Sequence, residues 1–228
     1  MSSLGRRVPT DWQHVEKYPL RVADVPTVPT PSAIGVNWYS NFDNPVYKDG
    51  HWWVGLTKDL GYIRGGHCVA LKQRYATDRA GWWDYYNQGQ EGACVGFGSS
   101  RMMSLINRKK YAARWLYLEA QLVDEYADTP PEEGTSVNAA MKILKAKGHC
   151  PVDAYGFAKP VSLAEGISAY RWATDVNDLL RILGYQDKNY VDFINSWGRE
   201  YPHLTRMPVD VLARLYNEYG EMVVITDR

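Results

Sequence analysis

The chain has 228 residues, which is long enough to bury a full hydrophobic core as one compact domain or as two small lobes packed together. Lys and Arg together number 26, and so do Asp and Glu, so the net charge is zero. No overall field exists to gather nucleic acid or anionic lipid, and we expect neither a nucleic-acid partner nor a membrane partner.

The N-terminus and the cysteines both bear on where the protein is located. The N-terminus carries Arg6 and Arg7 but no apolar stretch of signal-peptide length, and no later segment approaches a membrane span. The three cysteines, Cys68, Cys94 and Cys150, cannot all pair within one chain, and their spacing fits neither a disulfide scaffold nor a zinc knuckle. We therefore expect a reducing, cytoplasmic setting, no bound metal and no cofactor.

The first part of the chain combines an arm with two strand-like runs. Residues 1–32 are expected to form an N-terminal arm, which ends in a proline-rich linker over 21–32 (RVADVPTVPTPS). Residues 33–39 (AIGVNWY) and 68–71, the latter after a double glycine, are apolar runs typical of strands.

The middle third has helical periodicity, and the last third mixes strands and helices. The expected elements are helices at 94–110, 112–127, 135–147 and 175–183, a strand at 190–195, a helix at 208–219 and a strand at 221–226. Strands followed by helices and then strands again favour an α+β fold, with a helical lobe packed against a sheet lobe.

The strongest local pattern is NQGQEGACVGF at residues 87–97, in which Gln88 lies six positions before Cys94 and Gly92 keeps the loop between them tight. It resembles the active-site segment of papain-like cysteine peptidases, where a glutamine precedes by six residues a cysteine that opens a long helix. The resemblance implies that Cys94 is the nucleophile and Gln88 an oxyanion-hole donor. Amides at the helix start would favour the thiolate and point at the oxyanion.

A second pattern, Asn-Ser-Trp-Gly at 195–198, resembles the tetrapeptide that follows a strand in the same family. There the asparagine carbonyl accepts a hydrogen bond from the catalytic histidine, and the tryptophan shields that bond from water. The resemblance assigns these two roles to Asn195 and Trp197.

A third pattern, GGHCVAL at 65–71, resembles the family's glycine-histidine strand and implies that His67, after Gly66, is the catalytic base. The family's order is cysteine, histidine, asparagine, whereas this chain has the histidine first, and residues 175–185 contain no histidine. The simplest reconciliation is a circularly permuted or otherwise rearranged order, in which the strand pair 34–71 packs back beside the strand at 190–195.

The resemblance therefore implies a papain-like α+β fold, in which a helical lobe packs against an antiparallel sheet or barrel, with a permuted chain order. Its parts would be the arm at 1–32 and a catalytic domain at 33–228, divided into a displaced strand pair at 33–80, a helical lobe at 81–170 and a sheet lobe at 171–228.

Each assignment has a plainer alternative. A buried free cysteine is usually an inert apolar filler, and a histidine beside two glycines can be structural. If His67 is not the base, His149 or His203 could serve instead, whereas His14 and His51 have the character of surface residues.

Three function hypotheses remain at this level. The first is a cysteine endopeptidase that acts on a peptide or protein substrate. The second is a papain-like amidase or peptidase of the cell wall, although such relatives usually lack the Asn-Ser-Trp-Gly sequence. The third is a non-catalytic member of the fold, with a protein assembly partner in a virus particle or another complex. The compact design resembles small peptidases of bacteria and their phages, which implies a place in the cytoplasm or within a phage particle.

Overall fold

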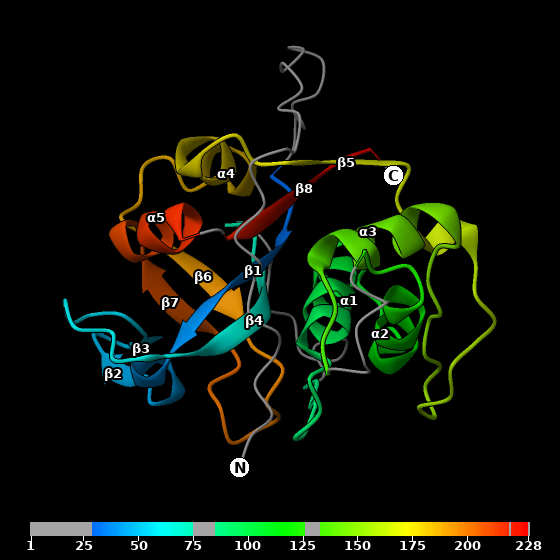
Figure 1. Ribbon diagram of the computed structural model, residues 1–228, viewed down its shortest axis with the longest axis horizontal. Helices are drawn as coiled ribbons and strands as arrows, with labels where there is room; N and C mark the ends of the chain where they lie inside the picture. Colours follow the sequence, from blue (N-terminus) through cyan, green and yellow to red (C-terminus); the bar gives the residue numbers. More distant parts are fainter. Residues whose placement is uncertain (1–28, 75–84, 126–132, 219, 228) are drawn as a thin grey trace.

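The computed structural model describes residues 29–74, 85–125, 133–218 and 220–227. Most of the expected arm at 1–32, the end of the segment 33–80 and the last residues of the helix expected at 112–127 lie outside these ranges. Figure 1 shows how the described elements are arranged.

The described residues form eight strands and five α-helices, with two short 3₁₀ helices. The strands are β1 (Ser32–Tyr39), β2 (Val46–Lys48), β3 (His51–Trp53), β4 (Ile63–Leu71), β5 (Ala169–Trp172), β6 (Tyr190–Ile194), β7 (Thr205–Pro208) and β8 (Glu221–Asp227). The helices are α1 (Cys94–Asn107), α2 (Ala113–Gln121), α3 (Val137–Ala146), α4 (Val176–Leu183) and α5 (Val209–Asn217), together with η3 (Ser40–Asp43) and η4 (Leu163–Glu165). The α+β class is confirmed.

All eight strands belong to one sheet, in the order β2-β3-β7-β6-β4-β1-β8-β5. β1 and β4 pair antiparallel, with Val36 opposite His67. On its other side β4 pairs antiparallel with β6, with Ala70 opposite Ile194. On its other side β1 pairs with β8, where Ile34 lies opposite Met222. The pair that carries His67 therefore occupies the middle of the sheet.

The expectation of an antiparallel sheet or barrel is wrong in two respects. The sheet is open, because β2 and β5 form its two edges and do not pair with each other. It is also mixed, because β3 and β7 are parallel, with Trp52 opposite Thr205. Apolar alternation marks a strand but carries no information about its partner or direction, so these pairings could not be obtained from the pattern.

The central strands bury both of their faces, because successive side chains point to opposite sides of a sheet. Along β4, Val69 and Leu71 pack into a core with α4 and α5, whereas Cys68 and Ala70 pack into a second core with α1, α2 and α3. The three middle helices thus cover one face of the sheet, and α4 and α5 cover the other (Figure 1).

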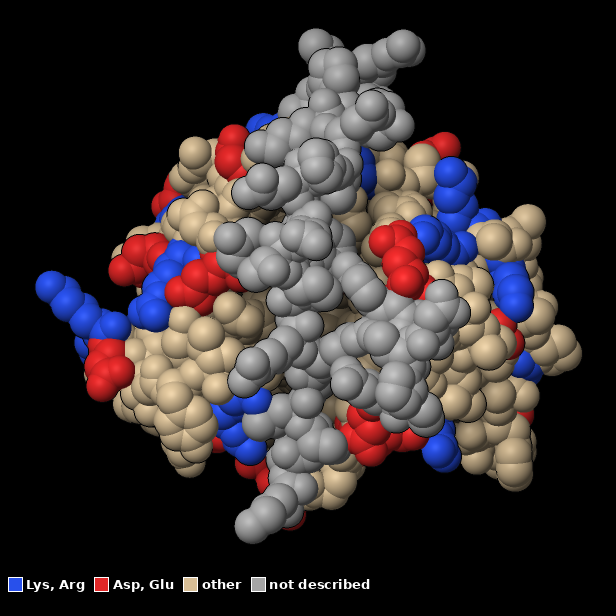
Figure 2. Space-filling view, in the orientation of Figure 1, with Lys and Arg blue, Asp and Glu red and all other residues tan. Residues whose placement is uncertain are grey.

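Charged side chains of both signs are visible on the face shown in Figure 2. On the face shown in Figure 2, Lys and Arg side chains are interspersed with Asp and Glu wherever the described residues are visible. None of the helices in the described ranges combines the length and the apolar character needed to cross a lipid bilayer.

Candidate active site

His67 lies on β4 and points at Asn195, which follows directly after β6. The His67 Nε2 atom is 2.8 Å from the Asn195 Oδ1 atom, and the same oxygen accepts a hydrogen bond of 2.7 Å from the Ser196 backbone N–H. Because a backbone N–H can only donate, the atom at that position is the amide oxygen, and Nε2 must carry the ring proton. In the neutral ring, Nδ1 is then left with a lone pair that can accept a proton.

Two tryptophans enclose this hydrogen bond. The His67 ring centroid is 4.7 Å from that of Trp38 and 4.9 Å from that of Trp197. His67 is 7% exposed and Asn195 is 5% exposed. Aromatic rings around a hydrogen bond exclude competing water and hold the orientation of the imidazole, so the His67–Asn195 pair is held in one geometry.

Burial also determines the charge of the histidine. Loss of solvation lowers the pKa of His67 to about 4, although the hydrogen bond to Asn195 and the negative charge of Asp43 act in the opposite direction. The desolvation effect is the larger one. The free energy of hydration that an imidazolium loses on burial exceeds what it gains from one neutral acceptor and one carboxylate. At neutral pH the resting imidazole is therefore uncharged.

Cys94 is the first residue of α1 and is 7% exposed. Burial raises the pKa of its thiol to about 11, whereas the backbone amides of Cys68, Val95 and Cys94 itself lower it. The expected amide contribution is thus present but is outweighed by desolvation, and the resting thiol is neutral. The amides at the helix start do favour the thiolate, as expected, but their effect is smaller than that of burial.

Helix α1 lies directly against the strand that carries the histidine. A Cβ atom added at Gly98 would be 2.7 Å from the sulfur and 3.0 Å from the carbonyl oxygen of Cys68, so only glycine permits this approach. Cys68 immediately follows His67, and its backbone is the group that reaches the Cys94 thiol. The structure therefore brings the start of α1 to the part of β4 that holds the imidazole.

The segment before α1 pairs with the segment after β6. The Gln88 N–H donates to the Ser196 carbonyl at 2.9 Å, and Asn87 forms an isolated antiparallel bridge with Trp197. The Gln88 Nε2 group donates to the Glu91 carbonyl at 3.1 Å, which leaves its second hydrogen for another acceptor. Gln88, Cys94, His67 and Asn195 thus come from chain segments that contact one another.

The two glycines assigned as supporting residues have distinct positions. Gly92 is buried, and a Cβ atom there would be 2.8 Å from the Cβ atom of Glu133, so the loop before Cys94 requires its small size. Gly66 lies on β4 opposite Asn37, and the preceding Gly65 has φ of 146°, a conformation that favours glycine.

The alternative bases are placed differently. His149 accepts a hydrogen bond from the Cys150 N–H at Nδ1 (2.9 Å), so its Nε2–H donates to the Ser100 hydroxyl (2.8 Å). With both nitrogens engaged, and with burial lowering its pKa to about 3, it is a structural histidine. The His203 ring packs on Tyr85, with the two centroids 4.7 Å apart.

His51 and His14 are the other two histidines of the chain. His51 is exposed on β3, and His14 lies outside the described residues.

Several residues around the imidazole were missed by the sequence reasoning. Trp38 lies on β1 opposite Gly65, so the glycine leaves room beside the indole, and the indole N–H donates to Asp43 at 2.9 Å. Tyr201 packs on Trp197 with centroids 5.1 Å apart and donates to the Phe42 carbonyl at 3.0 Å. Trp38 could not be found from the sequence, because its position beside His67 follows from the pairing of β1 with β4.

Within the described part of the chain, no group of three His, Cys, Asp or Glu side chains is placed to hold a metal ion. Comparison of the chain with protein-family models, with curated proteins and with solved structures found no match.

Proposed function

We propose that this chain is a cysteine peptidase of the papain type with a rearranged chain order, in which Cys94 is the nucleophile and His67 the general base and acid. The observation that carries the proposal is the hydrogen bond between His67 and Asn195, which are 128 positions apart in the chain, beneath the ring of Trp197. A carbonyl that fixes the tautomer of a buried imidazole is the arrangement that nucleophilic catalysis by a thiol requires.

Because Cys94 and His67 are both neutral at rest, the thiol proton is transferred during the attack on the substrate. As the Cys94 sulfur attacks the peptide carbonyl, His67 Nδ1 accepts the thiol proton. The resulting imidazolium is stabilised by Asn195 and by the charge of Asp43, the same two groups that raise the pKa of this ring. The imidazolium then protonates the leaving amine.

The oxyanion of the tetrahedral intermediate is held by the Cys94 backbone N–H and the free hydrogen of the Gln88 amide. Collapse of the intermediate gives an acyl-enzyme and a free amine. Water, deprotonated by His67, hydrolyses the thioester, which releases the carboxylic acid and restores the thiol.

The chain order is compatible with this proposal because catalysis needs spatial neighbours and not a fixed sequence of residues. The pair of β1 and β4 lies between β6 and β8, which places the histidine strand beside the asparagine strand even though it precedes the cysteine.

One observation favours a non-catalytic member of the fold as the second candidate. Both the thiol and the imidazole are more than nine-tenths buried, and burial opposes the charged form of each. A protein that retains the side chains for packing alone would have the same resting electrostatics.

The two candidates are separated by hydrolysis and by active-site labelling. We expect the chain to cleave unfolded casein, and a peptidyl epoxide to label Cys94 alone among the three cysteines. His67→Ala should abolish cleavage and slow the labelling, because the base that removes the thiol proton is lost.

The matched control is His203→Ala, which removes an imidazole that packs on Tyr85 and should leave both rates nearly unchanged. Labelling of Cys94 at the same rate in the His67→Ala variant, or no cleavage by a correctly folded chain, would favour the non-catalytic candidate.

A further inference from the structure

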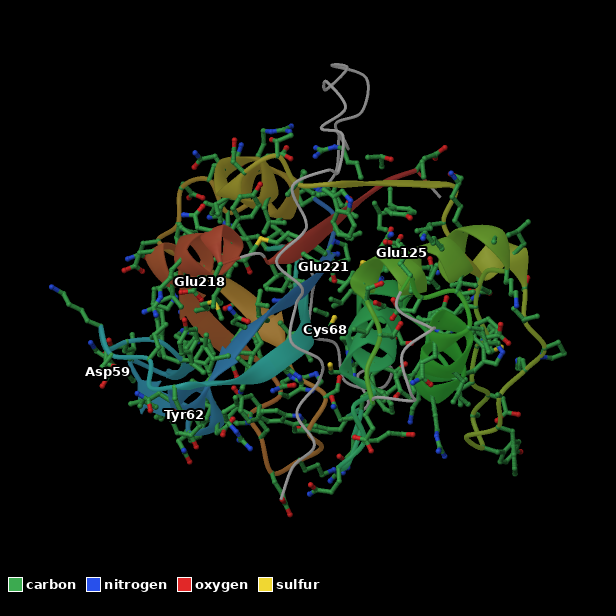
Figure 3. All side chains as sticks on the ribbon, viewed as in Figure 1. Asp59, Tyr62, Cys68, Glu125, Glu218 and Glu221 are labelled. Atoms are coloured by element: carbon green, nitrogen blue, oxygen red, sulfur yellow. The ribbon has the colours of Figure 1, made fainter. Side chains whose placement is uncertain are left out.

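A second thiol lies beside the proposed nucleophile. Cys68 and Cys94 are both free, and they are 1% and 7% exposed, respectively. Cys68 follows His67 on β4, on the face of the sheet that α1 covers, and Figure 3 shows it between the sheet and the helices. No step of the proposed hydrolysis uses this thiol.

Each cysteine contacts the chain segment that carries the other. The Cys68 sulfur faces Gly98, where an added Cβ atom would be 2.7 Å away. Gly98 is four residues after Cys94 on the same helix, so the two positions are neighbours on one face of α1. The Cys94 thiol in turn reaches the Cys68 backbone. Burial raises the pKa of Cys68, and the charge of a Cys94 thiolate adds to the rise.

We propose that Cys68 is a resolving thiol for Cys94, so that oxidation by a peroxide closes a disulfide between β4 and α1. In the first step the Cys94 sulfur attacks a peroxide oxygen and becomes a sulfenic acid, and the other oxygen leaves as water or an alcohol. In the second step the Cys68 sulfur attacks the sulfenic sulfur, and its proton leaves with the hydroxyl group as water. The two thiols lose two hydrogens, and the peroxide is the oxidant.

The difference in exposure sets the order of the steps. Cys94 is the more exposed of the two residues, and in the proposed mechanism it passes its proton to His67, whereas Cys68 is almost completely buried. Cys68 therefore reacts only with a sulfenic acid that has formed next to it. Cys150 is buried too, but its carbonyl pairs with Ala112 before α2, and the charge that acts on its thiol is that of Glu119.

The disulfide would block the nucleophile reversibly, and it would protect Cys94 from further oxidation to a sulfinic acid, which reductants do not reverse. The regulatory meaning rests on the proposed peptidase function. The formation of the bond does not, because it is measured on the protein without any substrate.

The test uses the full chain treated with hydrogen peroxide and analysed by mass spectrometry without reduction. We expect the loss of two hydrogen atoms, and a digest in which the peptide with Cys68 is joined to the peptide with Cys94. A thiol reductant should restore both free cysteines. The Cys150→Ala variant should behave in the same way.

Removal of Cys68 should change the product. Cys68→Ala, with Cys68→Ser as a second variant if the first is unfolded, should accumulate sulfinic acid on Cys94 that a reductant does not reverse. In the unsubstituted chain, sulfinic acid forming on Cys94 as fast as in these variants, a link to Cys150, or no change at all would each overturn the proposal. Absence of peptidase activity together with a Cys68–Cys94 link would instead refute only the proposed function.

Discussion

Replacement of Glu221 by glutamine should stabilise the protein at neutral and alkaline pH. Glu221 begins β8 and accepts a hydrogen bond of 2.9 Å from the Val137 N–H at the start of α3 through its Oε2 atom. Its Oε1 atom is buried and has no hydrogen-bond partner among the described residues. Burial raises its pKa to about 7, the nearby charges of Asp124 and Glu125 add to the rise, and the Val137 N–H opposes it. Figure 3 shows Glu221 between the sheet and α3.

The sign follows from proton binding in the two states. A folded pKa of about 7 against an ordinary value of 4.5 means that the folded chain keeps this proton to higher pH than the unfolded chain. The stabilisation is fully present below about pH 4.5 and is lost as the pH rises through about 7. At about 1.36 kcal/mol per pKa unit, the interval corresponds to at most roughly 3 kcal/mol.

Glu221→Gln keeps an acceptor for Val137 and removes the charge. At pH 8 we expect its free energy of unfolding to exceed that of the unsubstituted chain by up to ~3 kcal/mol, less the cost of burying the new NH₂ group. For a chain of this size, that is a rise in Tm of about 2–4 °C per kcal/mol. Near pH 4.5 the two proteins should have nearly equal Tm.

Thermal unfolding followed by circular dichroism from pH 4.5 to 8 measures the difference directly. Glu218→Gln is the matched control, because hydrogen bonds from Arg214 and Tyr39 lower the pKa of Glu218 in spite of its partial burial. That substitution should bring no gain at pH 8. A Glu221→Gln variant whose Tm difference from the unsubstituted chain is the same at both ends of the range would refute the reasoning.

Three further predictions concern the proposed site and the structural histidine His149. Gln88→Ala should lower kcat by about 10²-fold or less with the fold intact, because one of two oxyanion donors is lost, and an unchanged kcat would remove Gln88 from the mechanism. As the pH falls, kcat/KM should decrease below about pH 4, where His67 becomes charged. As the pH rises, kcat/KM should stay constant until about pH 11, where Cys94 ionises. A decrease near pH 8.5, the ordinary pKa of a thiol, would indicate a resting ion pair instead. His149→Ala should lower the free energy of unfolding by about 2–4 kcal/mol, because it leaves a cavity and unpaired polar groups, including the buried Ser100 hydroxyl, but kcat per folded molecule should be retained.

The long elements could be predicted from the sequence because their signals are local. The run at 33–39 became β1, and the motif around Cys94 correctly gave the first residue of α1. The strands β2, β3, β5 and β7 were missed, since strands of three or four residues show too little alternation to be recognised.

Some features of the candidate site could likewise be predicted from local sequence, and others could not. The spacing of Gln88 and Cys94 is a property of one short segment, so it could be read from the sequence. The contact of Trp38 with His67 depends on the pairing of β1 with β4, and the neutral state of the Cys94 thiol depends on burial. Both arise only when distant segments pack, which no local pattern contains.

The central position of β1 has a consequence for the order in which the protein can be assembled during synthesis. β1 is made before the other described strands, yet one of its two neighbours in the sheet is β8, and β4 must wait for β6. Such pairings between distant segments make folding slow, because a long loop must close before they contribute. The imidazole of His67 can therefore meet Asn195 only after the chain has been made beyond residue 195, so a shorter nascent chain lacks the hydrogen bond on which the proposed site depends.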